Sequence, residues 1–276
     1  MLSKLSFVTL ILAASCVCAQ TATHAVHKTT PVKSPESALP KTSAELSSAI
    51  LASYYHPDNL TLIDCDLLVD WNAFYHSVKV DVDPDRLRSL QGLKIHSREV
   101  RGRPLELHFD WTNGTIATQE QIESGMKQMV GGFYQMYWPM IAGPIVGPGD
   151  KLEQIESLPG GGEKTSTKSS GMNISMVLDP SGAPTHYEFE GGAMGGKTDV
   201  TYMASPNPAP GDLRRIASMK IDEHIGTSTF NIDLKLDYQN VSGFSIPNRV
   251  SFGLVGAYTI DLQFSGCSAS TVAVSQ

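Results

Sequence analysis

The second half of the chain alternates apolar and polar residues over long stretches. The clearest case runs from Phe230 to Tyr238, where every second residue is apolar. A period of two places the apolar side chains on one face of a β-sheet and the polar ones on the other. Turn signals such as Asp179-Pro180-Ser181-Gly182 separate successive stretches. This pattern predicts an antiparallel meander with one buried face and one solvated face.

About ten strands are expected, and two or three helices accompany them. The helix expected near 43–55 carries Leu46, Ile50 and Tyr54 on one apolar stripe. Another is expected to begin at Thr118, with Gln121 placed for a capping box. Pro84 is expected to open a short helix. The expected strands are 60–71, 94–101, 105–111, 173–178, 185–190, 197–204, 213–222, 227–237, 244–253 and 258–264.

Composition narrows the class of protein. The chain has 276 residues, of which 41% are hydrophobic, so it can build a core and is not disordered throughout. Its formal net charge is −7, and its Lys and Arg residues are not clustered. Binding to nucleic acid needs clustered cations to neutralise phosphates, so no nucleic-acid partner is expected.

The N-terminus has the layout of a secretory signal peptide over 1–19. Lys4 precedes the apolar run 5–14, and Val17-Cys18-Ala19 supplies small residues before Gln20. We therefore expect a periplasmic or secreted protein with no transmembrane span after cleavage. An alternative interpretation takes Ala13-Ala14-Ser15-Cys16 as a lipobox, which predicts a form lipid-anchored on Cys16. A polar, Pro-containing flexible linker is expected over 20–42.

One domain is expected over 43–267, followed by a C-terminal tail over 268–276. Cleavage of the signal peptide leaves two cysteines, Cys65 and Cys267. An even number of cysteines in an exported protein predicts one disulfide, and the alternative is a pair of buried free thiols.

An uncharged stretch over 129–148 is rich in Met, aromatic, Gly and Pro residues. Its many helix breakers argue against a membrane span, and Pro139 is expected to end or kink the second helix. Methionine lines adaptable apolar cavities, so this helix predicts a site for flexible apolar chains. The alternative is a permanent core. The candidate lining residues are Met126, Met129, Phe133, Met136, Tyr137, Trp138 and Met140.

Two segments resemble motifs of outer-membrane lipoprotein-sorting (LolA/LppX-like) proteins. Residues 179–185 resemble their D-x-x-G-x-P-x turn, and residues 238–250 resemble their strand pair with Gly243, Pro247 and Arg249. By element order the resemblance covers roughly residues 43–266. It implies an α+β, mainly β fold: a single antiparallel sheet curled as an open half-barrel around helices. It also implies that the concave face holds lipid or lipoprotein acyl chains.

No linear motif of an enzyme is present in the sequence. It lacks a His-Glu-x-x-His helix, a Gly-x-Ser-x-Gly elbow, a phosphate loop and paired Cys-x-x-Cys. No catalytic residue, metal or cofactor is expected. His96, His108 and His186 show no ligand spacing, and Asp64, Asp66 and Asp70 are expected on a solvated strand face. Glu223 and His224 are expected in an exposed turn, and residues 191–196 in a hairpin loop.

The sequence therefore favours an exported, non-enzymatic carrier of the cell envelope that binds a hydrophobic ligand. The alternative is a structural or protein-interaction domain of the envelope with the same fold and a filled core, whose partner is another envelope protein. A hydrolase with a dispersed site has no support in the linear sequence.

Overall fold

The computed structural model describes residues 41–57, 59–114, 117–143, 145–146, 150–169, 171–203 and 213–271. The expected signal peptide, the alternative lipidation site at Cys16 and the linker up to residue 40 lie outside these ranges. So does the expected tail beyond residue 271. None of the helices in the described part of the chain is long and apolar enough to cross a bilayer.

The described strands form one antiparallel sheet, as predicted. Its order is β3-β2-β1-β12-β11-β10-β9-β8-β7-β6-β5-β4, so the last strand of the chain lies beside the first. The twelve strands are β1 (Leu62–Val69), β2 (Leu93–Val100), β3 (Glu106–Trp111), β4 (Glu153–Ser157), β5 (Glu163–Ser169), β6 (Met172–Leu178), β7 (Pro184–Gly191), β8 (Met194–Tyr202), β9 (Ile216–Ile225), β10 (Ser228–Val241), β11 (Phe244–Leu254) and β12 (Tyr258–Ser270).

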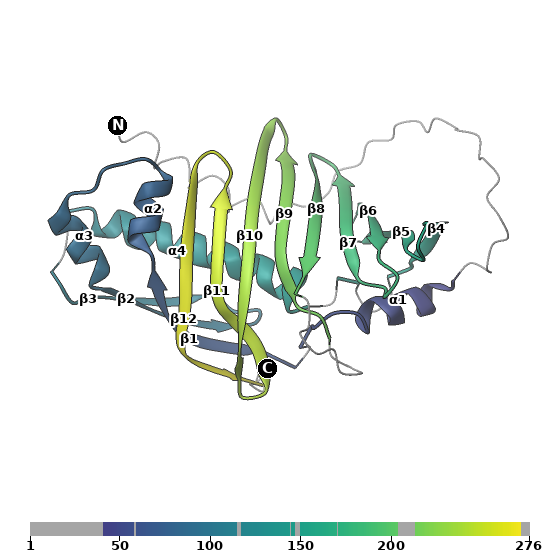
Figure 1. Ribbon diagram of the computed structural model, residues 1–276, viewed down its shortest axis with the longest axis horizontal. Helices are drawn as coiled ribbons and strands as arrows, with labels where there is room; N and C mark the ends of the chain where they lie inside the picture. Colours follow the sequence, from purple (N-terminus) through teal and green to yellow (C-terminus); the bar gives the residue numbers. More distant parts are fainter. Residues whose placement is uncertain are drawn as a thin grey trace.

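The sheet is curled into an open half-barrel, and a long helix crosses one of its faces. Figure 1 shows this helix, α4, running across strands β12 to β9, with β1–β3 drawn below it and crosswise to those strands. The helix α1 lies at the opposite end of the sheet, near β4. The helical segments are α1 (Ser43–Leu51), α2 (Trp71–Ser77), α3 (Pro84–Gln91), α4 (Gln119–Met136) and a π-helical turn, η3 (Tyr137–Ile141).

The residues before the helices explain most of their starts. Thr42 and Glu45 form a capping box on α1, and the Asp70 and Asp83 carboxylates accept backbone N–H groups at the starts of α2 and α3. Thr118 precedes α4, as predicted, but the predicted capping box does not form. Its φ of −105° and ψ of 19° depart from the extended conformation of a capping residue, and its side chain makes no cap hydrogen bond.

The core lies between the sheet and the helices on its inner face. In β10, Leu234 and Leu236 are buried while Lys235 and Asp237 are exposed, so the predicted alternation is confirmed. The apolar side chains of β9, β11 and β12 continue the same inner face, because the cross-strand register aligns Met219, Leu234 and Phe252. The helices cover this face, and the opposite face carries mostly polar residues.

The predicted disulfide joins β1 to β12. Cys65 and Cys267 are bonded with their Cα atoms 4.2 Å apart, across 202 positions of sequence. The ladder between the two strands shifts register between Asp64 and Asp66, where Gly266 and Cys267 of β12 lie opposite Cys65 alone, so the bulge is in β12. The disulfide therefore ties the beginning of the domain to its end at the place where the ladder is irregular. The strand β12 continues beyond Cys267 to Ser270.

Candidate functional site

The candidate lining residues all pack against one core on the inner face of the sheet. Met126 and Phe133 of α4 are buried, as are Tyr137 and Trp138 of η3. Met129, Met136 and Met140 are partly buried against the same core. The structure thus brings all seven predicted residues together, and it shows the interior between α4 and the sheet as filled by side chains.

Aromatic rings form the centre of this packing. The centroid of the Phe133 ring lies 5.3 Å from that of Tyr134, 5.6 Å from that of Tyr137 and 6.0 Å from that of Phe264 on β12. Trp138 meets Tyr137 edge to face at 5.3 Å. These separations are typical of attractive aromatic pairs. The Phe133–Phe264 pair joins α4 to β12, and the other pairs lie within α4 and η3.

The α-helix gives way to a π-helical turn at the predicted breaker. The backbone N–H of Ala142 donates to the Tyr137 carbonyl at 2.8 Å, a bond across five residues that encloses Pro139. Proline has no N–H to continue the α-helical pattern, which explains why α4 ends at Met136. Single π-helical turns interrupt helices frequently at functional sites, and this one carries Tyr137, Trp138 and Met140.

Sequence reasoning missed a buried carboxyl beneath this turn. Glu99 of β2 is 5% exposed and accepts a hydrogen bond from the Trp138 Nε1 at 3.1 Å. Burial raises the pKa of Glu99, and the bond from Trp138 offsets part of the rise. The available signal was the alternation Leu93, Ile95, Ser97, Glu99, which places the carboxyl on the same face as two core residues.

A large groove lies on the other, solvated face, away from the seven candidates. It has a volume of about 1110 Å³ and crosses β4 to β10. Its charges are partly paired across strands: Lys197 lies 3.4 Å from Asp222, and His224 lies 4.0 Å from Glu190. The charged lining residues are Lys151, Glu153, Lys168, Glu188, Glu190, Lys197, Asp222, Glu223 and His224.

The strands that line this groove differ from two expectations of the sequence analysis. Glu223 and His224 lie within β9, paired with Gly196 and Gly195 of β8, and not in an exposed turn. The predicted hairpin loop contains a tighter turn than expected, because β7 extends to Gly191 and β8 begins at Met194. These strands are longer than the alternating pattern predicts, because backbone hydrogen bonds to neighbouring strands continue past the alternating residues.

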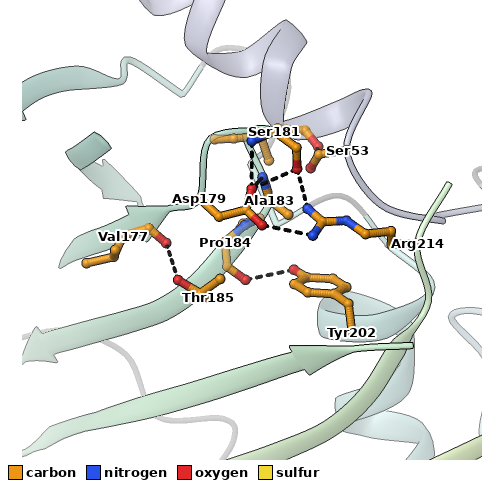
Figure 2. Close-up of polar contacts among 10 residues, drawn as sticks. Ser53, Val177, Asp179, Ser181, Ala183, Pro184, Thr185, Tyr202 and Arg214 are labelled. Atoms are coloured by element: carbon orange, nitrogen blue, oxygen red, sulfur yellow. Dashed lines mark hydrogen bonds and ion pairs between the residues drawn. The ribbon is translucent and has the colours of Figure 1, made fainter. Parts of the chain in front are cut away.

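The motif at 179–185 forms the β6–β7 turn and is fixed by a cluster of polar contacts (Figure 2). The Asp179 carboxylate accepts the backbone N–H groups of Ser181 and Ala183 and the guanidinium of Arg214 at 2.8 Å. Arg214 also donates to the Ser181 hydroxyl. Gly182 has a φ of +89°, and a Cβ atom there would lie 2.8 Å from the Ala49 carbonyl oxygen. The turn therefore has a structural role, because its close approach at Gly182 allows α1 to pack against it.

Arg214 connects this turn to the interior strands. Its guanidinium lies 4.8 Å from the centroid of the Tyr202 ring, and its carbonyl accepts the backbone N–H of Tyr55 at 2.8 Å. Tyr202 in turn donates to the Pro184 carbonyl at 2.7 Å. The cluster joins β6, β7, β8 and the segment after α1, which is why we expect it to contribute to stability.

This cluster predicts a dependence of stability on pH. Partial burial acts to raise the pKa of Asp179, but hydrogen bonds from Arg214, Ser181 and Ala183 hold it below its usual range. A carboxyl group whose pKa is lowered by folding stabilises the fold at a pH above its unfolded pKa of about 3.9. This stabilisation is lost as the pH falls through the folded pKa. At pH 7, Asp179→Asn is expected to cost about 1–2 kcal/mol of unfolding free energy.

Urea unfolding of both proteins between pH 7 and pH 2.5 measures this effect. The difference between wild type and Asp179→Asn should stay constant above about pH 5 and shrink below about pH 4. Asp85→Asn is the control, because Asp85 is an exposed carboxylate paired only with Arg88 within α3. A difference that persists unchanged at the lowest pH would contradict the prediction.

The aspartates and histidines of β1 and β2 form a separate cluster. His96 lies between two carboxylates, with Nε2 3.1 Å from Asp64 and Nδ1 3.0 Å from Asp66. The His108 ring stacks 6.5 Å away, while Asp70 caps α2 instead of joining them. Within the described ranges, no three His, Cys, Asp or Glu side chains are arranged to hold a metal ion.

Comparison of the chain with family models, curated proteins and solved structures finds no match. The resemblance to LolA-like proteins therefore rests on its two motifs and on element order, and it stays a prediction. In the structure the first motif is the β6–β7 turn. The second is the β10–β11 hairpin, whose turn contains Ser242 and Gly243, both with positive φ.

Proposed function

We propose that this chain is an exported, non-catalytic carrier that binds a lipid or the acyl chain of a lipoprotein between α4 and the sheet. One observation carries the proposal. A long helix rich in Met and aromatic residues occupies the inner face of an open sheet and ends in a π-helical turn. Apolar ligand sites are commonly concave and lined in this way.

The ligand enters this interior only if α4 moves, because the side chains between α4 and the sheet are packed against one another. Partly buried methionines favour such a change, since unbranched, polarisable side chains repack around different shapes. The turn η3 gives the helix a place to bend, because Pro139 cannot donate a backbone hydrogen bond there. The aromatic contacts of Phe133 and Tyr137 would be exchanged for contacts with the ligand.

A second candidate function has its own observation. Phe133 and Tyr137 are 2% and 1% exposed, which is also what a permanent core requires. An envelope domain with a filled core would bind its partner at the surface. The polar groove on the opposite face is a surface on which a protein partner could bind. This alternative predicts that no ligand accompanies the folded chain.

Native mass spectrometry separates these two functions. The mature protein is expressed with its own signal, measured under gentle conditions and then extracted with organic solvent. A carrier is expected to show a stoichiometric excess of mass that resolves into acyl lipids. A bare mass from several gentle preparations would contradict the carrier function and support the interaction domain.

The substitution Met136→Glu gives an independent prediction. Met136 is partly buried at the end of α4, so a carboxylate there faces any chain that lies along the helix. We expect at least a ~10-fold loss of bound lipid with retained cooperative unfolding, because a charge is costly beside an apolar ligand but is tolerated at a partly exposed site. Extraction and thermal unfolding of the same sample measure both quantities.

The control is Gln135→Glu, which adds the same charge on the exposed side of the helix. It should retain the lipid and the melting temperature of the wild type. If Met136→Glu unfolds the protein while wild type carries no lipid, the interior is a permanent core and the carrier function is wrong.

A further inference from the structure

Four polar or aromatic side chains converge where β2 meets the end of α4. Ser97 and Glu99 are two residues apart on the strand and share its inner face. Tyr134 and Trp138 are four residues apart at the junction of α4 and η3, so they project from the same side. We call these four residues the β2–α4 cluster.

Three polar atoms of this cluster have no hydrogen bond of ordinary geometry to another protein atom among the described residues. The Trp138 Nε1 donates to Glu99 Oε1, but Glu99 Oε2, Ser97 Oγ and the Tyr134 hydroxyl make no hydrogen bond of ordinary geometry. Ser97 lies close enough to Tyr134 to offset part of the rise that burial causes in the pKa of that phenol. Ser97, Glu99 and Tyr134 are 0%, 5% and 1% exposed, so bulk water does not satisfy these atoms.

A buried polar group without a hydrogen bond raises the free energy of the folded state, because it has lost its bonds to water without gaining others. Here three occur within one cluster, beneath the helix that the proposed function requires to move. A partner that bonds all three atoms at once would remove this cost. It would have to donate to a carboxylate oxygen and bond two hydroxyls.

We propose that the β2–α4 cluster binds the polar head of an amphiphile whose chain lies along α4, and that this head donates hydrogen bonds and carries no negative charge. The inference rests on the proposed function and names the ligand class for the same interior. A primary amine fits best, because it has several N–H donors and its positive charge complements the carboxylate of Glu99. An anionic head would face the carboxylate of Glu99.

Competition binding with three probes of equal chain length tests this inference. Dodecylamine, dodecanol and dodecanoic acid, each below its micelle concentration, displace the apolar dye N-phenyl-1-naphthylamine from the full mature chain. Wild type is expected to bind the amine at least ~10-fold more tightly than the acid, with the alcohol between them. Glu99→Gln keeps an acceptor for Trp138 and should remove most of the preference for the amine over the acid.

The matched control is Glu106→Gln, which removes an exposed carboxylate from β3 and should change none of these affinities. If Glu99→Gln fails to fold, Ser97→Ala serves in its place and should reduce amine binding severalfold. If the dye binds but the three probes bind equally, the head-group inference is overturned and the carrier function stands. If neither dye nor probe binds, the carrier function itself fails.

Discussion

Replacing Cys65 and Cys267 together by alanine is expected to lower the free energy of unfolding by about 5 kcal/mol. The two residues are 202 positions apart, and closing a loop of this length removes much conformational entropy from the unfolded chain. The strand β1 comes first in the domain and pairs with β12, which comes last. Without the disulfide, this junction depends on the β1–β12 ladder, with its bulge, and on the contact of α2 with β12.

Urea unfolding of the oxidised wild type, the wild type in dithiothreitol and the double variant measures the effect. Alanine is preferred to serine because Cys65 is fully buried and a hydroxyl there would need a new partner. The reduced wild type and the double variant should agree closely. A loss below about 1 kcal/mol would contradict the prediction and show that strand pairing alone closes the sheet.

The substitution Phe133→Ala is expected to lower the free energy of unfolding by about 3–5 kcal/mol. The Phe133 ring is 2% exposed and packs between Tyr134, Tyr137 and Phe264, so its removal opens a space at the centre of the core. Alanine favours the helix slightly more than phenylalanine does, so helix propensity does not account for the loss. Unfolding in urea with far-UV circular dichroism measures it.

The control for Phe133→Ala is Ile122→Ala, at the start of the same helix. Ile122 is only partly buried, so its truncation should cost clearly less than that of Phe133. Equal costs would show that the packing of α4 is uniform along its length. A loss below about 1 kcal/mol for Phe133→Ala would show that its ring faces a space already open.

The sequence predicted the strands whose residues alternate and the helices whose apolar residues recur every four positions. It missed β4 and β5, whose sequences Glu153–Ser157 and Glu163–Ser169 are mostly polar. The strand β5 forms because β6 offers it backbone hydrogen bonds, and β4 pairs with β5 in the same way, a contribution that does not depend on apolar side chains. The short helix α2 was missed because seven residues are too few to show a period.

The pairing of Cys65 with Cys267 followed from counting, and the grouping of the seven candidates followed from their place on one helix. Whether those candidates face a space or a packed core did not follow from the sequence. Periodicity reports which side of an element is buried, but the element that covers that side depends on the order of strands in the sheet.

The sequence by itself determined a single antiparallel sheet with one apolar face, a Met-rich helix to cover it and a cysteine pair to close it. Only the tertiary structure placed Glu99 beneath Trp138 and Tyr134, and only it produced the polar groove on the opposite face. Both depend on residues far apart in the chain that the sheet order and curl bring together. The residue pattern of one segment does not predict such contacts, because the free energy that selects them comes from packing between segments.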